Sequence, residues 1–385
     1  MTDEDTNFSS VEQALDLMRS GGMIILVDDK DRENEGDLIV AAEHCTAEHV
    51  NFMCRYGRGL VCLALTAARV EHLRLPMMVP TDPGNMGTAF TVSIEARRGV
   101  STGISAADRA QTIRTAVDPR STAEDLVSPG HVFPLRAQPG GVLVRSGHTE
   151  GAVDLARLAG LTPAGVICEI MRDDGEMARM DDLEAFARRH DMPIITIADL
   201  IGYRLARETL VEEIGQAPLA SAFLGLNPDT GWTIRTFRSR VDPLEHYMAI
   251  CKGDLSDGGS TDPVLIRAQR AQVLGDVFGF GGTSGQRLRA ALRQIDRVGR
   301  GMLLYVIGRE VQQDVARVVG RTTPTGIGLK PAESGFRQFG MGAQVLAALG
   351  LRRIRVITDN PRKIIGLKGY GIEVAGTVPL EGDPS

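Results

Sequence analysis

Aromatic side chains are scarce in this chain of 385 residues, at 4% of the total. Stacking on aromatic rings is a common way to hold single-stranded nucleic acid, so this composition disfavours that function. The net charge of −6 also disfavours general binding to nucleic acid or to anionic membranes. No apolar run approaches the roughly 20 residues that a membrane-spanning helix needs, and the polar, acidic N-terminus shows no signal peptide. We therefore expect a cytoplasmic protein with neither a nucleic-acid partner nor a membrane partner.

Cysteine is rare as well. The five cysteines are widely spaced and include no Cys-x-x-Cys pair. Their odd number and their spacing are typical of reduced thiols rather than of a disulfide framework or a zinc cage. Hydrophobic residues make up 43% of the chain and charged residues 24%, as in globular proteins. The length allows two or three domains of ordinary size. The cysteines are Cys45, Cys54, Cys62, Cys168 and Cys251.

The order of apolar and polar segments divides the chain into two blocks. Residues 11–203 alternate strand-like apolar runs with helical patterns, which indicates an α/β fold. The pattern weakens over residues 204–228, and a second α/β block follows. We therefore expect a first domain at 1–205, a linker at 206–228, a second domain at 229–378 and a tail at 379–385.

Apolar runs bounded by turn residues predict the strands, and periodic runs with capping residues predict the helices. Helices are expected at 11–20 and at 105–117, where the second opens with a capping-box spacing from Ser105 to Asp108. Strands of the first block are expected at 23–27, 38–42, 60–65, 89–94, 141–144, 166–171 and 194–197. Those of the second block are expected at 264–268, 302–307 and 354–358.

The segment between the first two apolar runs carries an unusual density of charge. Residues 28–37 hold six carboxylates and two basic side chains, a net charge of −4. Like charges this close destabilise one another unless a positive group lies among them. Mg²⁺ suits a site of one or two carboxylates completed by substrate oxygens. The sequence therefore indicates either a metal-binding loop or a solvated acidic turn.

The segment from Arg145 to Glu150 is a second candidate, at an expected strand–helix junction. The N-terminus of a helix presents free N–H groups to anions, and an arginine there offers bidentate contacts to phosphate. His148 either completes a metal site begun by the acidic loop or is simply a packed histidine.

Glu169 is a third candidate, because it is the only charge in the apolar run 166–171. A carboxylate in such a strand is costly to bury unless it is paired or functional. Function is one account of it, and placement at a sheet edge or a salt bridge to an arginine is the other.

Two further segments complete the set. Residues 101–105 lead into the helix that carries Asp108 and Arg109, which suits a phosphate cradle. His131 lies in an expected loop framed by proline and glycine at 128–135, and histidine can transfer protons near neutral pH. Five such signals within one block are hard to explain as unrelated accidents.

Together these segments resemble the 3,4-dihydroxy-2-butanone 4-phosphate synthases of riboflavin biosynthesis. The resemblance covers residues 11–205 and implies a mixed α+β sheet. It also implies a lyase that converts D-ribulose 5-phosphate to 3,4-dihydroxy-2-butanone 4-phosphate and formate. Mg²⁺ or Mn²⁺ is the implied cofactor, and the implied assembly is a homodimer with sites near the subunit boundary. The motifs, in order, are DDKDRENEGDL, STGISAADRAQT, SPGHVFPL, RSGHTEGAVDLARLAG and VICEIM.

The resemblance assigns roles to individual residues. Glu33 and His148 match metal ligands, and His131 and Glu169 match positions essential to turnover. Cys62 matches a pocket-lining cysteine, although a small buried apolar side chain is an equally good account of it. The positions that match substrate contacts are Arg32, Glu33, Asp37, Cys62, Thr102, Arg145, Ser146, Gly147, His148, Thr149 and Glu169.

The second block resembles GTP cyclohydrolase II, through segments 275–279, 339–344, 358–363 and 369–371. That family holds zinc with three cysteines, and none of them is present here. Gln272 stands at the first position, and residues 281–285 contain no cysteine where the other two belong. Gly335 replaces the acidic proton acceptor, whereas Arg337, Thr358 and Lys363 match retained positions. We therefore expect no zinc.

These losses predict a degenerate domain without GTP cyclohydrolase activity. Its expected role is that of a scaffold, with nucleotide sensing as the alternative. Two other descriptions of the whole chain stay open: a bifunctional enzyme that includes GTP cyclohydrolase II activity, and a silent regulatory protein that binds a metal or a nucleotide.

Overall fold

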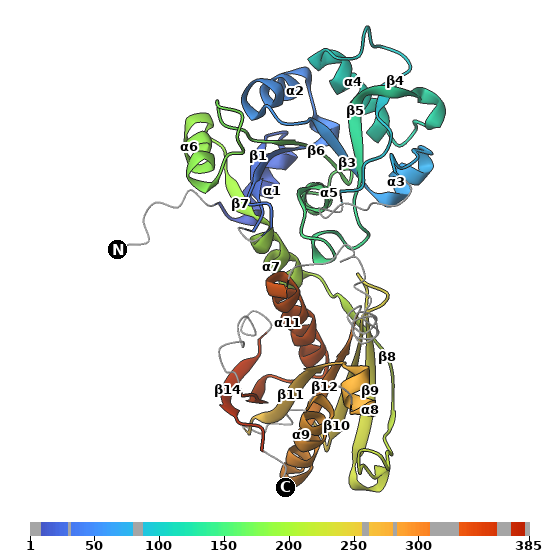
Figure 1. Cartoon of the computed structure of the whole chain (residues 1–385), viewed down its shortest axis with the longest axis vertical. Helices are drawn as coiled ribbons and strands as arrows, with labels where there is room; N and C mark the ends of the chain where they lie inside the picture. The colour runs from blue at the N-terminus through green and yellow to red at the C-terminus, as the bar shows by residue number, and fades with distance from the viewer. Residues whose placement is uncertain are drawn as a thin grey trace. The chain divides into compact units, whose positions relative to one another are not determined.

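The computed structural model describes most of the chain and divides it into two compact units (Figure 1). One unit is formed chiefly by residues up to Tyr203 and the other chiefly by residues from Arg204 onward. Each contains one seven-stranded sheet. Among the described residues, no helix is both long and apolar enough to cross a bilayer. The described residues are 9–29, 32–79, 88–255, 262–279, 283–308, 331–359 and 371–381, without the side chains of Pro228 and of 331–339.

The sheet of the first unit mixes parallel and antiparallel pairs in the order β4-β5-β3-β6-β2-β1-β7. β1 and β2 are buried along their whole length, as their continuous apolar runs predict. The strands are β1 (Ile24–Val27), β2 (Gly36–Ala41), β3 (Cys62–Leu65), β4 (Ile94–Ala96), β5 (Leu126–Arg136), β6 (Ala164–Glu169) and β7 (Ile194–Thr196).

Helices cover both faces of this sheet. α1 and α5 pack against one face, and α2, α4 and α6 pack against the other, where they share a core with Ile25 and Val40. Residue Ser10 forms the expected start of α1, through a capping box with Gln13. The helices are α1 (Val11–Arg19), α2 (Ala47–Phe52), α3 (Ala67–His72), α4 (Ala106–Val117), α5 (His148–Leu158), α6 (Met180–His190) and α7 (Ile197–Arg207).

Strand register places several candidate residues at one end of this sheet. Asp37 of β2 lies directly opposite Glu169 of β6. Cys62 of β3 pairs with Ile167 of β6 on one side and with Phe133 of β5 on the other.

Two predictions of local structure in this unit are wrong because of glycine. Residues 141–144 form a 3-10 turn instead of a strand, since Gly140 and Gly141 have φ angles of 95° and 65°. Conversely, the expected loop at 128–135 lies within the range of β5, where only residues 128–131 bulge out of the ladder with β4. Gly130 permits this, because a Cβ there would stand 2.0 Å from the carbonyl oxygen of Ile94.

Two other boundaries also differ from expectation. The strand expected at 89–94 overlaps β4 at Ile94 alone, and Phe90 forms an isolated bridge with Leu135. The segment 206–228, expected to be a linker, contains the end of α7 and the whole of β8, so regular structure fills much of it.

The second unit has a sheet in the order β14-β13-β11-β12-β10-β9-β8, with α9 packed on one face through Leu288, Leu292 and Ile295. Its strands are β8 (Val211–Pro218), β9 (Trp232–Ser239), β10 (His246–Lys252), β11 (Val264–Arg270), β12 (Gly301–Ile307), β13 (Arg353–Ile357) and β14 (Glu373–Val378). Its helices are α8 (Val273–Phe278), α9 (Ser284–Val298) and α11 (Pro331–Ala348).

Candidate active site

The described part of the acidic segment, residues 28–29 and 32–35, lies between the paired strands β1 and β2, and Asp28 organises it. One carboxylate oxygen of Asp28 accepts the backbone N–H of Glu35 at 2.9 Å, and the other accepts that of Glu33 at 3.1 Å. Asp28 itself is buried. Its carboxylate therefore holds the backbone of Glu33 and Glu35 in place rather than extending into solvent.

Arg32 supplies positive charge within this loop. Its Nη1 lies 2.8 Å from a carboxylate oxygen of Asp28 and 2.8 Å from Oε2 of Glu33. The side chain is 12% exposed, so the pairing is shielded from water. The carboxylates raise the pKa of Arg32, although burial opposes them. The positive charge of Arg32 therefore offsets part of the negative charge of the acidic segment.

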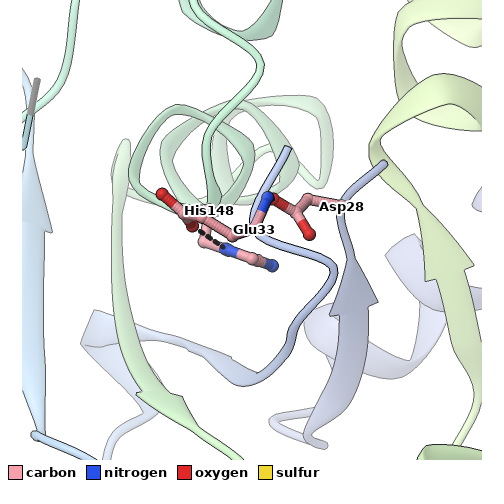
Figure 2. A group of neighbouring side chains, drawn as sticks. All are labelled: Asp28, Glu33 and His148. Carbon is pink, nitrogen blue, oxygen red and sulfur yellow. Dashed lines mark hydrogen bonds and ion pairs between the residues drawn. The ribbon is translucent and has the colours of Figure 1, made fainter. Parts of the chain in front are cut away.

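His148 brings the first turn of α5 to the acidic loop. Figure 2 shows Asp28, Glu33 and His148 gathered together, and a ligand atom of each lies within 4.8 Å of the others. His148 Nδ1 is 3.8 Å from Glu33 Oε2 and 3.8 Å from Asp37 Oδ1. Burial lowers the pKa of His148, while the negative charges of Asp28 and Glu33 raise it.

Two polar atoms of this cluster are buried without a hydrogen-bond partner, Nε2 of His148 and Oδ1 of Asp37. A buried polar atom without a partner is costly, and an imidazole nitrogen beside carboxylates is a usual donor set for a divalent cation. The residues present therefore fit a metal ion.

Asp37 and Glu169 place two carboxylates side by side across β2 and β6. Burial and the charge of Glu169 raise the pKa of Asp37 well above its ordinary value. Glu169 is held by the backbone N–H of Leu60, which donates to its Oε2 at 2.8 Å. Gly59 allows this approach, because a Cβ there would lie 2.4 Å from the same oxygen. Glu169 is in a central strand, and no ion pair joins it to an arginine among the described residues.

Cys62 lies in β3, beside this pair, and is buried. Burial, together with the negative charges of Glu169 and Asp37, raises the pKa of its thiol. The side chain is therefore a neutral, small and largely apolar group next to the carboxylates.

The segment before α5 is held by a buried ion pair. Arg145 Nη1 lies 2.7 Å from Glu150 Oε2, and the other oxygen of Glu150 accepts the backbone N–H of Gln138 at 2.9 Å. Gly147 is needed here, because a Cβ would lie 2.2 Å from the guanidinium of Arg145. This pair orders the entry to α5, and Ser146 and Thr149 are buried along with it.

His131 belongs to a separate contact network in the same unit. Its Nδ1 lies 2.6 Å from Oε2 of Glu95. The residue next to Thr102, Gly103, lies against this pair, whereas Thr102 itself is exposed. No described contact links His131 to Glu33 or to Glu169.

The structure thus brings Arg32, Glu33, Asp37 and His148 together, with Glu169 adjacent. Sequence reasoning missed Glu95 and the organising role of Asp28. The isolated charge in the apolar segment 90–96 is the signal that could have identified Glu95, as it did for Glu169.

The second unit has a cavity of about 310 Å³ where the sequence places the altered zinc positions. Gln272 lines this cavity together with three arginines. The unit's cysteine, Cys251, is buried in β10, and burial raises the pKa of its thiol to about 12. Residues 281–282, 360–363 and 369–370 lie outside the described residues, as do the side chains of Gly335 and Arg337. The arginines are Arg267, Arg270 and Arg287.

Comparison with known proteins gives two family matches. Residues 12–203 match the model of 3,4-dihydroxy-2-butanone 4-phosphate synthase, and residues 224–379 match that of GTP cyclohydrolase II. The riboflavin biosynthesis protein RibBA of Aquifex aeolicus is 46% identical over 394 residues, covering 99% of this chain and 95% of the relative. The monofunctional riboflavin biosynthesis protein RIBA 2 of Arabidopsis thaliana is 43% identical, covering 97% and 77%.

A solved structure matches along the full length. The crystal structure of RibBX from A. baumannii, described as a two-domain 3,4-dihydroxy-2-butanone 4-phosphate synthase, has a TM-score of 0.78 and 36% identity. The match covers 97% of this chain and 100% of the other. The chain therefore belongs to the family of two-domain riboflavin biosynthesis proteins, and its first domain is a 3,4-dihydroxy-2-butanone 4-phosphate synthase domain, an enzyme of that pathway.

Proposed function

We propose that the chain converts D-ribulose 5-phosphate to 3,4-dihydroxy-2-butanone 4-phosphate and formate. The observation that carries this proposal is the cluster of Glu33, Asp37, His148 and Glu169 at one end of the first sheet. The reaction divides five carbons into four and one, and the atoms of the two products sum to those of the substrate. It needs groups that move protons beside a carbonyl, and such groups are gathered here.

Glu33 and His148 are the residues we assign to a divalent cation, Mg²⁺ or Mn²⁺. The Nδ1 of His148 lies 3.8 Å from Oε2 of Glu33, whereas both oxygens of Asp28 already accept hydrogen bonds from the loop. A cation at this site would supply a Lewis acid for negative charge on adjacent substrate oxygens.

Glu169 is the residue we assign to proton transfer, together with a carboxylate of the acidic loop. The Leu60 N–H holds one oxygen of Glu169, which fixes the carboxylate in place. A positioned acid–base group of this kind accelerates a reaction by about 10²–10⁴-fold. His131 is a second group suited to proton transfer, since its side chain is 42% exposed and reaches solvent.

The remaining assignments concern substrate binding. The side chains near Glu33 and Glu169 that we assign to the substrate are Arg32, Asp37 and Cys62. Thr102 lies in the loop next to His131. Residues 145–149 form the entry to α5, whose N-cap residue Gly147 provides no side-chain cap. Free N–H groups at such a helix start suit a phosphate. We also propose a homodimer with its sites near the subunit boundary.

The second domain, we propose, has no GTP cyclohydrolase activity. Without the zinc cysteines, it lacks the usual means of activating water for hydrolysis. The description of RibBX as a two-domain synthase supports this, and RIBA 2, by its name, is a relative with a single function. The names of others, such as RibBA, fit the alternative of a bifunctional enzyme. The arginine-lined cavity favours one remaining role, the binding of a nucleotide phosphate.

One experiment separates these proposals. Purified protein is incubated with D-ribulose 5-phosphate, once with Mg²⁺ and once with EDTA, and formate is measured. GTP consumption and zinc content are measured on the same preparation. Metal-dependent formate release without GTP consumption or zinc supports the synthase with an inactive second domain. GTP consumption with bound zinc would show a bifunctional enzyme, and no formate would refute the synthase assignment.

A further inference from the structure

The contact between Glu95 and His131 is the starting point. Glu95 lies in β4 and His131 in the neighbouring β5, and Oε2 of Glu95 is 2.6 Å from Nδ1 of His131. Glu95 is 8% exposed, so its carboxylate lies inside the protein, while the imidazole extends outward. A buried carboxylate on an exposed histidine can order the ring without being reached by solvent.

Glu95 is itself held from behind. Oε1 of Glu95 accepts a hydrogen bond from the Thr112 hydroxyl at 2.9 Å. The same hydroxyl accepts the backbone N–H of Ala96 at 3.0 Å. Thr112 is fully buried in α4. Both oxygens of the carboxylate are therefore engaged, one by the threonine and one by the histidine, which leaves little freedom for rotation.

Gly103 closes the network from the side of the 101–105 loop. A Cβ at Gly103 would lie 1.9 Å from Oε2 of Glu95 and 2.6 Å from Nδ1 of His131, and the φ angle there is +91°. Asp108 fixes this loop, because its carboxylate accepts the backbone N–H groups of Ser101 and Gly103. The loop carrying Thr102 is thus held against the Glu95–His131 pair.

We propose that Glu95 is a positioning residue, which holds the proton of His131 on Nδ1 and leaves Nε2 as the atom that exchanges protons with substrate. This inference rests on the role proposed above for His131. A carboxylate that accepts from one ring nitrogen fixes the tautomer and the orientation of the ring. Thr112 fixes the carboxylate in turn, so the network runs from Thr112 through Glu95 to His131.

The test replaces Glu95 by glutamine, which keeps the shape of the side chain and removes its charge. We expect kcat for formate release to fall by about 10–100-fold, with KM unchanged. The ¹⁵N signals of the His131 ring should show one Nδ1–H tautomer in the natural protein and a mixture of tautomers in Glu95→Gln. Glu124→Gln, at an exposed carboxylate near the same sheet edge, is the matched control and should change neither readout.

A second pair of variants keeps the proposal testable if Glu95→Gln does not fold. Thr112→Val removes the hydroxyl that holds Glu95, and we expect a smaller loss of kcat in the same direction. Thr115→Val is its control, because Thr115 lies in the same helix and bonds only within it, to Gln111. An unchanged kcat, or an unchanged tautomer pattern, in a folded Glu95→Gln protein would overturn the proposal.

The ring signals also separate this inference from the proposed function. They report on the Glu95–His131 contact whether or not the protein releases formate. If the natural protein releases no formate, the proposed function fails. In that case the proton-exchange role of Nε2 fails with it, and the tautomer measurement decides only whether Glu95 orders the ring.

Discussion

Replacing Glu169 by glutamine tests the proposed chemistry at its centre. The carboxylate is held by the Leu60 N–H and lies across from Asp37 on the next strand. Glutamine retains an oxygen that can accept the Leu60 N–H, so the local hydrogen bond survives. It cannot take up a proton. We therefore expect kcat to fall by about 10²–10⁴-fold, equivalent to about 2.7–5.5 kcal/mol in the barrier.

The stability of this variant should change little. Removing one of two neighbouring carboxylates relieves a like-charge interaction that raises the pKa of Asp37, and the substitution opens no cavity. We expect a shift in Tm of only a few degrees, about 1 kcal/mol or less in the free energy of unfolding. Formate release, thermal unfolding and circular dichroism measure the three quantities on one preparation.

A control variant shows whether the loss of activity is specific to Glu169. Glu176→Gln changes an exposed carboxylate soon after the same strand and should release formate at the natural rate. A folded Glu169→Gln protein that releases formate as fast as the natural enzyme would refute the assignment. A large drop in Tm would instead indicate that Glu169 serves the fold.

Four further outcomes are expected. Glu150→Gln removes the carboxylate that pairs with Arg145 in the protein interior and should lower the free energy of unfolding by about 3–5 kcal/mol, measured by urea titration. Co-expressed Glu33→Ala and His131→Ala chains should regain up to about one quarter of natural activity if two subunits share each site, and none if each subunit is self-sufficient. At pH 8, iodoacetamide should label Cys54 alone in the folded protein, as mass spectrometry would show, since the other four cysteines are buried. Burial raises the pKa of those four thiols above that of the unfolded chain, so stability should fall as the pH rises above about 8.5.

The sequence predicts the buried strands well because their signal is local. Apolar runs of four to six residues correspond to β1, β2 and β6, which are buried on both faces. β5 is not predictable in this way. Its proline and glycine residues are typical of a loop, and Gly130 instead allows close packing against β4, a contact between segments distant in the sequence.

In the candidate site, too, some residues have a local sequence signal and others are identified only by contacts between distant segments. The acidic loop and His148 stand out by charge and by position, and the structure places them together. The partner of His131 does not stand out, because the contact with Glu95 depends on how β4 pairs with β5. Strand pairing of this kind is a tertiary property that a single sequence does not reveal.

The position of Arg32 has a consequence for how the acidic loop takes up a cation. Its guanidinium already occupies Oε2 of Glu33 and a carboxylate oxygen of Asp28. A cation that binds Glu33 through this oxygen either shares it with the guanidinium of Arg32 or takes its place. In both cases a positive group next to the site weakens the binding of the cation. The affinity of the acidic segment for a cation is therefore lower than its number of carboxylates implies, which favours an exchangeable ion over a permanently bound one.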